Sequence, residues 1–495
     1  MIEWAMVELD RPFLIDNTEF YVSIEVSTAD DTEKRSINNL CAHQSVGSCP
    51  YCLSQETWKK INSIFPAVDR SIYGFDVPSG LRDGLKAREG YSKFGRLFPM
   101  WLQPIDVFHV FIEGVFDVIV RELYSGTTQI DVFKDAEMVD VSTVKLPSHS
   151  RRVTENLKKR RGAEKESRFQ TVVVGTGLMG HMHPVASVII LLTHQIYRLQ
   201  VAPIYPDDDF ISMVDAAVDL LEKVIVKYAK QLINGPKLHQ ILYHMKKQVR
   251  RFGPLGPYST RPFEHAYHIL QRNLCSEITV NVGASLIRNC SLLTDLVSET
   301  KWRLQNQPSL YHDDVDFRQL VTELKLDKNR LRRARSEQVP EDLAHLALPG
   351  EVFTKTHYIR GVKFSSTINP KSDNSLVVFR LSPISCHGYA RVMGFLTKDD
   401  STVVLLHPFT LSGAHLLDIS RQLDEFGFPS DWNQNFMDIA DPRFGASIEI
   451  RGLTKEHVMS QPIRASLAAV EGHATLVKGP STDIIVPLSQ RPHLS

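Results

Sequence analysis

The spacing of hydrophobic residues changes along the chain, and this change limits the folds open to it. Over 105–124 and 214–228, apolar residues recur three and four positions apart, which is typical of amphipathic helices. After residue 350 the pattern changes to short strand-like runs, as at 375–379, 389–393 and 403–406. The sequence therefore predicts a mainly helical middle followed by a mostly β module over roughly 350–488.

Composition narrows the class of protein. With 495 residues, 43% hydrophobic and 23% charged, the chain has an ordinary globular composition and is too long for one small domain. Lys and Arg number 57, and so do Asp and Glu, so the formal net charge is zero. Any affinity for DNA must then come from local basic patches.

The cysteine content and the N-terminus indicate the compartment. Six cysteines are too few for a disulfide scaffold, and no basic-then-apolar leader follows Met1, so we expect an intracellular, reducing environment. The longest stretch without charged side chains is 169–197, and its apolar core, 188–192, is far shorter than the roughly 20 residues that span a bilayer. We predict no membrane partner.

A candidate metal site comes from two distant pairs of residues. Cys49 and Cys52 form a CxxC, whose thiolates can share one zinc ion. His239 and His244 would complete a tetrahedral set if the fold brings the pairs together. Five residues turn a regular helix by about 140°, so this pair chelates best at a helix end or distortion. The alternative is ordinary buried thiols and surface histidines.

Three acidic residues are candidates for chemistry. Asp106, His109 and Glu113 lie within two helical turns, with Asp106 and His109 on one face. The alternative is a helix N-cap by Asp106 with a packed histidine. Glu264 stands among apolar neighbours, where a carboxylate needs a partner or a cation, although a glutamate at a helix N-terminus is also common.

Clusters of basic residues are candidate phosphate contacts, with solvated helix faces as the alternative. The runs are Arg151, Arg152, Lys158, Lys159, Arg160 and Arg161, then Lys246, Lys247, Arg250 and Arg251.

A glycine motif at 175–180 imitates a dinucleotide-binding loop. We reject this function, because that loop needs a helix directly after it and residues 181–184 (HMHP) interrupt the turn, and because no acidic residue occurs between 170 and 206. We therefore expect no nucleotide cofactor.

Taken in order, these motifs resemble the catalytic region of CACTA-type (En/Spm, Tnp2-like) DNA transposases. The CPxC loop, the D-x-x-H helix at Asp106 and the segment around Glu264 are similar to that family's motifs. The resemblance implies an α/β fold with an RNase H-like core and a large, mainly helical insertion over 1–340, followed by the β-rich module at 350–488. Asp31, eighteen residues before Cys49, matches the second catalytic Asp, and Glu264 matches the third carboxylate.

The resemblance also implies ligands and partners. Cys49, Cys52, His239 and His244 are similar to a zinc site of the related V(D)J-recombinase lineage, so Zn²⁺ would be structural. Asp31 and Glu264 would bind catalytic Mg²⁺ or Mn²⁺, while Asp106 and His109 would position DNA or support that cluster. The implied partners are double-stranded DNA at transposon ends and further copies of the chain, and the implied location is the nucleus.

The sequence also departs from the family pattern. No counterpart of the first catalytic Asp occurs before Asp30, Thr32-Glu33 replaces the usual Pro-Ala, and Tyr267 replaces an Asn after the glutamate. Because Asp30 precedes Asp31, the match is ambiguous by one position. Two functions are therefore expected: metal-dependent DNA cleavage and strand transfer with an incomplete site, or a non-catalytic DNA-binding or scaffold protein of the same origin.

Overall fold

The structure is a computed structural model of the chain. It describes residues 103–124, 130–141, 144–148, 162–201, 208–261, 313–323, 337–359, 362–369, 372–381, 388–398, 401–412, 414–440, 459–478 and 483–488, shorter pieces at 13–15, 18–20, 49–53, 68–69, 295–300, 302–303, 446–448, 450–451 and 456–457, and residues 128, 150 and 307.

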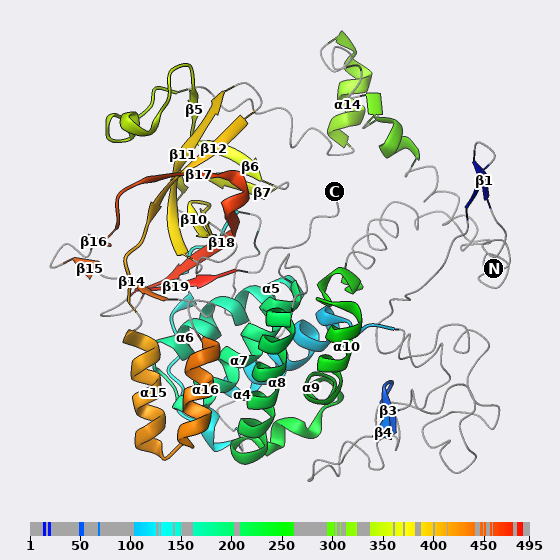
Figure 1. The fold of residues 1–495 in the computed structure, drawn as a ribbon, viewed down its shortest axis with the longest axis vertical. Coiled ribbons are helices and arrows are strands. Elements are labelled where there is room, and N and C mark those ends of the chain that lie inside the picture. Colours follow the sequence, from blue (N-terminus) through cyan, green and yellow to red (C-terminus); the bar gives the residue numbers. More distant parts are fainter. Residues whose placement is uncertain are drawn as a thin grey trace.

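Helices build the lower half of the molecule in Figure 1. The α-helices are α4 (Phe116–Tyr124), α5 (Gly162–Arg168), α6 (Val174–Leu178), α7 (Pro184–Val201), α8 (Asp208–Tyr228), α9 (Pro236–His239), α10 (Met245–Phe252), α14 (Val315–Glu323), α15 (Ala414–Phe426) and α16 (Ser430–Ala440). The described residues also include the π-helical segments η4 (Phe108–Val115), η7 (Phe169–Val173) and η9 (Gln240–His244). Short 3-10 turns are η5 (Asp131–Phe133), η8 (Lys230–Asn234), η10 (Gly256–Tyr258), η12 (Glu341–Leu346) and η14 (Leu467–Ala469).

The centre of this helical module is α7. Its Pro184 stands at the first helical position, where the missing N–H is not needed. Side chains from Val185 to Leu192 are fully buried, because α6, α8, α15 and α16 pack around α7. Within the described residues, no helix combines the length and the apolar character that a membrane crossing requires.

Antiparallel strands form the second module, in the upper left of Figure 1. Its main sheet has the order β13-β14-β19-β18-β10-β11-β12-β17, and β5 also pairs with β11. The strands are β5 (Val352–Thr354), β6 (Thr356–Ile359), β7 (Val362–Ser365), β8 (Ile368–Asn369), β9 (Ser372–Asp373), β10 (Leu376–Phe379), β11 (Gly388–Lys398), β12 (Ser401–Pro408), β13 (Leu411–Ser412), β14 (Ala446–Ile448), β15 (Ile450–Arg451), β16 (Glu456–His457), β17 (Ile463–Ser466), β18 (Val470–Val477) and β19 (Asp483–Pro487).

The sheet curls where β11 changes its neighbour. The register against β12 shifts between Val392 and Gly394, and β11 pairs with β10 before this bulge and with β5 after it. A Cβ at Gly394 would lie 2.2 Å from the ring of Phe353. Glycine is therefore required for the close approach of β5, and the bulge bends the strand around the apolar interior.

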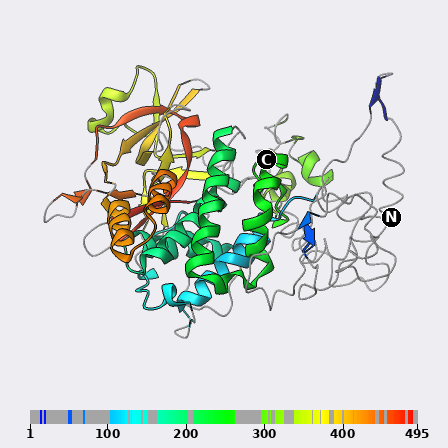
Figure 2. The same cartoon turned by 60° about the horizontal axis from the view of Figure 1, so that its bottom comes forward.

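Two helices from the C-terminal part of the chain return to the helical module. α15 contacts α7, and α16 contacts α8, so residues after the long β-hairpin complete the helical core (Figures 1 and 2). Their buried residues, such as Leu423 and Phe436, belong to the same hydrophobic cluster as α7.

The two modules share a packed seam. Val477 of β18 lies against Gly175 of α6, where an added Cβ would be 3.0 Å from the valine side chain. Gly175 thus serves helix–sheet packing within α6. The segment 145–148 also joins the β module, because the backbone N–H and hydroxyl of Ser148 both donate to Asn374 Oδ1.

The expected mixture of helix and sheet is confirmed, as are the helices predicted at 105–124 and 214–228. Among the described residues of 1–340, strands are limited to the short pairs β1 (Phe13–Ile15) with β2 (Thr18–Phe20) and β3 (Cys52–Leu53) with β4 (Val68–Asp69). The RNase H-like core therefore stays a prediction.

Candidate metal centre and adjoining carboxylate network

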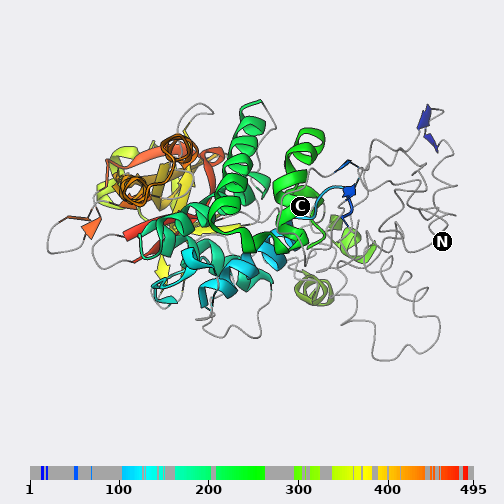
Figure 3. The same cartoon turned by 90° about the horizontal axis from the view of Figure 1, so that it is seen from below.

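Four side chains from two distant parts of the chain meet in a buried cluster. Cys49 and Cys52 come from the loop at β3, which lies beside α9 and α10 in Figure 3, and His239 and His244 come from α9 and η9. Cys49 Sγ is 3.4 Å from His244 Nε2, and Cys52 Sγ is 3.3 Å from His239 Nε2. The two Nε2 atoms are 3.0 Å apart, and all four ligand atoms lie within 4.8 Å of one another.

A local distortion of the helix brings the two histidines together. The segment Gln240–His244 is π-helical, and Met245 N donates to Gln240 O, five residues earlier. Five-residue hydrogen bonding widens the turn, so residues five apart face the same side, whereas a regular helix would separate them by about 140°. The expectation that this pair needs a helix distortion is confirmed.

The electrostatics of the cluster suit a thiolate. Burial alone raises the pKa of the Cys49 thiol, but contacts with Cys52, His244 and His239 lower it by more. The pKa of Cys49 therefore lies well below its ordinary value. Since the thiolate is the form that binds metals, the protein environment favours the ligand state.

The donor set fits a tetrahedral zinc ion. With Zn–S of about 2.3 Å and Zn–N of about 2.0 Å, donors on a tetrahedron are about 3.3–3.8 Å apart. The sulfur–nitrogen distances of 3.3 and 3.4 Å match this, and the nitrogen–nitrogen distance of 3.0 Å is slightly shorter. Two cysteines and two histidines, closed off from solvent, are typical of structural zinc. The cluster could therefore bind a metal such as zinc.

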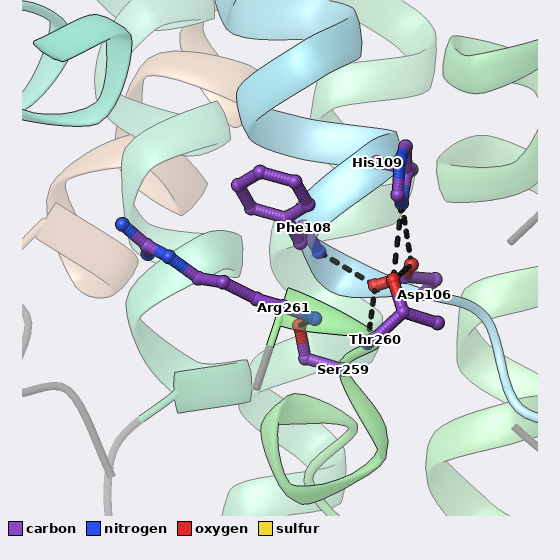
Figure 4. A network of polar contacts seen from close by, with 6 residues as sticks. All are labelled: Asp106, Phe108, His109, Ser259, Thr260 and Arg261. Atoms are coloured by element: carbon purple, nitrogen blue, oxygen red, sulfur yellow. Dashed lines mark hydrogen bonds and ion pairs between the residues drawn. The ribbon is translucent and has the colours of Figure 1, made fainter. Parts of the chain in front are cut away.

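A second polar network surrounds Asp106, at the start of the helix that η4 continues. Figure 4 shows His109 and Thr260 directed at the Asp106 carboxylate. His109 Nδ1 is 2.6 Å from Asp106 Oδ2, and the Thr260 hydroxyl donates to the same oxygen. The backbone N–H groups of Phe108 and Thr260 donate to Oδ1, at 3.0 and 3.4 Å.

The hydrogen bonds to the Asp106 carboxylate indicate the role of this residue. A carboxylate offers about four lone-pair positions, and four donors from Phe108, His109 and Thr260 use them. The side chain is only 2% exposed, so these protein donors are the neighbours of the carboxylate. The bond from the Phe108 N–H fits the N-cap interpretation of Asp106, and the carboxylate also contacts His109 and the distant Thr260.

The same network determines which ring nitrogen of His109 carries a proton. Because the Asp106 carboxylate is an acceptor, Nδ1 of His109 must carry a proton, which directs Nε2 away from Asp106. The imidazole is 21% exposed, so it stands at the edge of the network. Such a histidine can transfer a proton or contact a phosphate.

A neighbouring ion pair was not apparent from the sequence. Arg261 donates to Glu166 Oε2 at 2.7 Å, Tyr197 donates to the other oxygen, and the Arg261 guanidinium lies over the Phe108 ring. Glu166 occurs in a basic stretch and is separated from Arg261 by 95 residues, so no local pattern signals the contact. The pair anchors residues just before Glu264.

Several predicted site residues lie outside the described residues. They are Asp31, Glu264, Arg151, Arg152, Lys158, Lys159, Arg160 and Arg161. The metal-binding and DNA-binding roles expected of them stay predictions.

The basic run on α10 belongs to the described part of the chain, and Lys246 and Arg250 form ion pairs with α8. Lys246 pairs with Asp219, and Arg250 pairs with Asp215, both on α8. These ion pairs hold α10 on α8, which is a structural role. Lys247 and Arg251 are exposed and stay candidates for phosphate contact.

Comparison with known proteins adds no further assignment. No protein-family model matches the chain, and no curated protein matches its sequence.

Proposed function

We propose that this chain is a zinc-containing, transposase-derived protein that works on double-stranded DNA. One observation carries the proposal: the two ligand pairs that the transposase resemblance links, separated by 187 and 195 residues, lie together in a buried Cys₂His₂ cluster. Zinc at this cluster would join the cysteine loop to the helix that leads to Thr260 and on to Glu264.

The proposed reaction is phosphodiester cleavage and strand transfer. Asp31 and Glu264 would hold Mg²⁺ or Mn²⁺, which supply charge stabilisation for the attacking and leaving oxygens. Asp106 keeps His109 and Thr260 in place, and His109 presents an N–H or a ring nitrogen toward the substrate backbone. Arg261, paired with Glu166, anchors the segment that carries Glu264.

A second candidate is a non-catalytic DNA-binding or scaffold protein of the same origin, with nuclear location and assembly on DNA in either case. The hydrogen bonds of Asp106 favour this non-catalytic candidate. Among the described acidic candidates, Asp106 has a buried carboxylate, and that carboxylate accepts four hydrogen bonds that hold Phe108, His109 and Thr260 in place. In this candidate, zinc and the Asp106 network maintain a DNA-binding fold without the chemistry.

The metal content of the purified chain tests the proposed zinc site. We expect about one zinc per chain by elemental analysis, and its loss in the Cys52→Ala and His239→Ala variants. His183→Ala is the matched control, because His183 lies on the helical module but outside the cluster. Purified chain without zinc, or equal zinc in all variants, would contradict the proposed site.

Cleavage and binding assays separate the two functions. With Mn²⁺ and duplex DNA carrying the element's ends, we expect nicking or joining that Glu264→Gln abolishes. DNA binding without any cleavage supports the non-catalytic candidate. A Lys247→Ala, Arg251→Ala double variant should weaken DNA binding on every sequence and reduce the salt slope by about 2 if both residues contact phosphates.

A further inference from the structure

We propose that Tyr51 and Gly114 are positioning residues that couple metal binding at the Cys₂His₂ cluster to the Asp106–His109 pair. The inference rests on the proposed metal site and goes beyond it, since it assigns a route from that site to the network. The segment 103–114 carries the pair, and both halves of the cluster contact this segment.

The cysteine half contacts the beginning of the segment. Tyr51 lies between the two cysteines, and its hydroxyl donates to the carbonyl oxygen of Gln103 at 3.1 Å. Both residues are buried, so water does not replace this bond readily. Gln103 precedes Asp106 by three residues, so the position of the cysteine loop sets where the Asp106 helix begins.

The histidine half contacts the other end. Helix α9 packs against η4, and a Cβ at Gly114 would lie 3.0 Å from Lys237 Cγ and 2.9 Å from the carbonyl oxygen of His109. Lys237 precedes the ligand His239 by two residues. Glycine at 114 therefore permits the contact, and any movement of His239 is passed to the backbone turn that contains His109.

Thr260 connects the histidine half of the cluster to Asp106 as well. After His244 the chain continues as α10 and η10, and Thr260 then donates through both its hydroxyl and its N–H to Asp106. Asp106 and His109 are thus enclosed by two segments that the metal would join. Without a metal, the buried contacts among the four ligands are weaker links, and the two segments can shift relative to each other.

A spectroscopic signature of His109 tests the coupling in the full chain. The Nδ1 proton held between His109 and Asp106 should give a low-field proton NMR signal, which His109→Gln identifies by removing it. Zinc removal by a chelator should broaden or shift this signal, and readdition of zinc should restore it. Amide hydrogen exchange in 103–115 should rise about two- to tenfold on zinc removal, while β11 and β12 stay unchanged.

Variants separate positioning from metal binding. Tyr51→Phe should keep the zinc content but raise amide exchange in 103–108 by about two- to tenfold and shift the His109 signal. Gly114→Ala should shift the signal as well. Thr475→Val is the matched control, because it removes the hydrogen bond of a buried hydroxyl to a backbone carbonyl, that of Lys145, outside both segments of the proposed route.

Each result decides between the proposals. If the chain binds no zinc, the metal site and the coupling are both wrong. If zinc binds but the His109 signal and the exchange of 103–115 are the same with and without zinc, the coupling alone is overturned. A Tyr51→Phe variant indistinguishable from Thr475→Val also overturns the role of Tyr51.

Discussion

The Asp106→Asn substitution should destabilise the helical module strongly. In the native chain, Asp106 Oδ2 accepts from His109 Nδ1 and from the Thr260 hydroxyl. An Asn keeps one acceptor oxygen for the two backbone N–H groups, but its amide nitrogen cannot accept from the His109 N–H or the Thr260 hydroxyl. Two charge-assisted hydrogen bonds are lost, each worth about 1.5–3 kcal/mol.

The size of the effect follows from burial. Because Asp106 is 2% exposed, water does not replace the lost contacts, although a neutral amide is easier to bury than a carboxylate. We expect a loss of about 3–4 kcal/mol, which lowers the melting midpoint by about 10 °C for a module of this size. Thr260→Val, which removes one of the bonds and leaves the carboxylate, should lower it by roughly half as much.

Far-UV circular dichroism during heating measures this change. Asp418→Asn is the control, because Asp418 lies on α15 of the helical module and pairs with Arg421 at 2.9 Å, with both side chains exposed. Such a pair contributes less than about 1 kcal/mol, so we expect a shift of about 3 °C or less. If Asp106→Asn melts within about 3 °C of the native chain, the reasoning that this network supports the module is refuted.

Three further predictions concern other parts of the molecule. A chelator should lower the melting midpoint of the native chain and leave that of Cys52→Ala unaffected. The reason is that a metal at 100 times its Kd adds about 2.7 kcal/mol to the free energy of unfolding. Equal shifts of the two midpoints would argue against the metal site. Gly394→Ala should destabilise the β module by about 1–3 kcal/mol, measured by urea unfolding, since the new methyl overlaps the Phe353 ring; an unchanged midpoint would contradict this packing. Burial and Arg198 hold the pKa of His194 well below its ordinary value, so only the unfolded chain takes up this proton as the pH falls below about 6.5. The free energy of unfolding should then fall by up to about 1.4 kcal/mol per pH unit, and His194→Leu should flatten that dependence in melts from pH 8 to about pH 5.

Local patterns in the sequence were sufficient for part of the fold. The spacing in 105–124 and 214–228 predicts α4 and α8, because a helix needs only a repeating apolar face to choose its conformation. The π-helical turns were not predicted as such, since hydrophobic spacing does not distinguish them from α-helical turns. The expected need for a distortion between His239 and His244 came from the chelation geometry.

The candidate site depended on contacts that no local pattern carries. Four ligand positions could be proposed because CxxC and paired histidines are recognisable residue types, and a family resemblance linked them. The bond from Thr260 to Asp106 spans 154 residues, and the pair of Arg261 with Glu166 spans 95. Neither Thr260 nor Glu166 differs from an ordinary surface residue in the sequence.

Spacing and residue type therefore predict the helices at 105–124 and 214–228, the strands near 375–379, 389–393 and 403–406, and the residues that could bind a metal. The tertiary structure alone decided that α15 and α16 return to the helical core, that Asp106 is saturated by donors and that Tyr51 contacts Gln103. The physical reason is that periodicity specifies which face of an element is buried. The partner on that face is selected by packing and hydrogen-bond satisfaction across the whole chain.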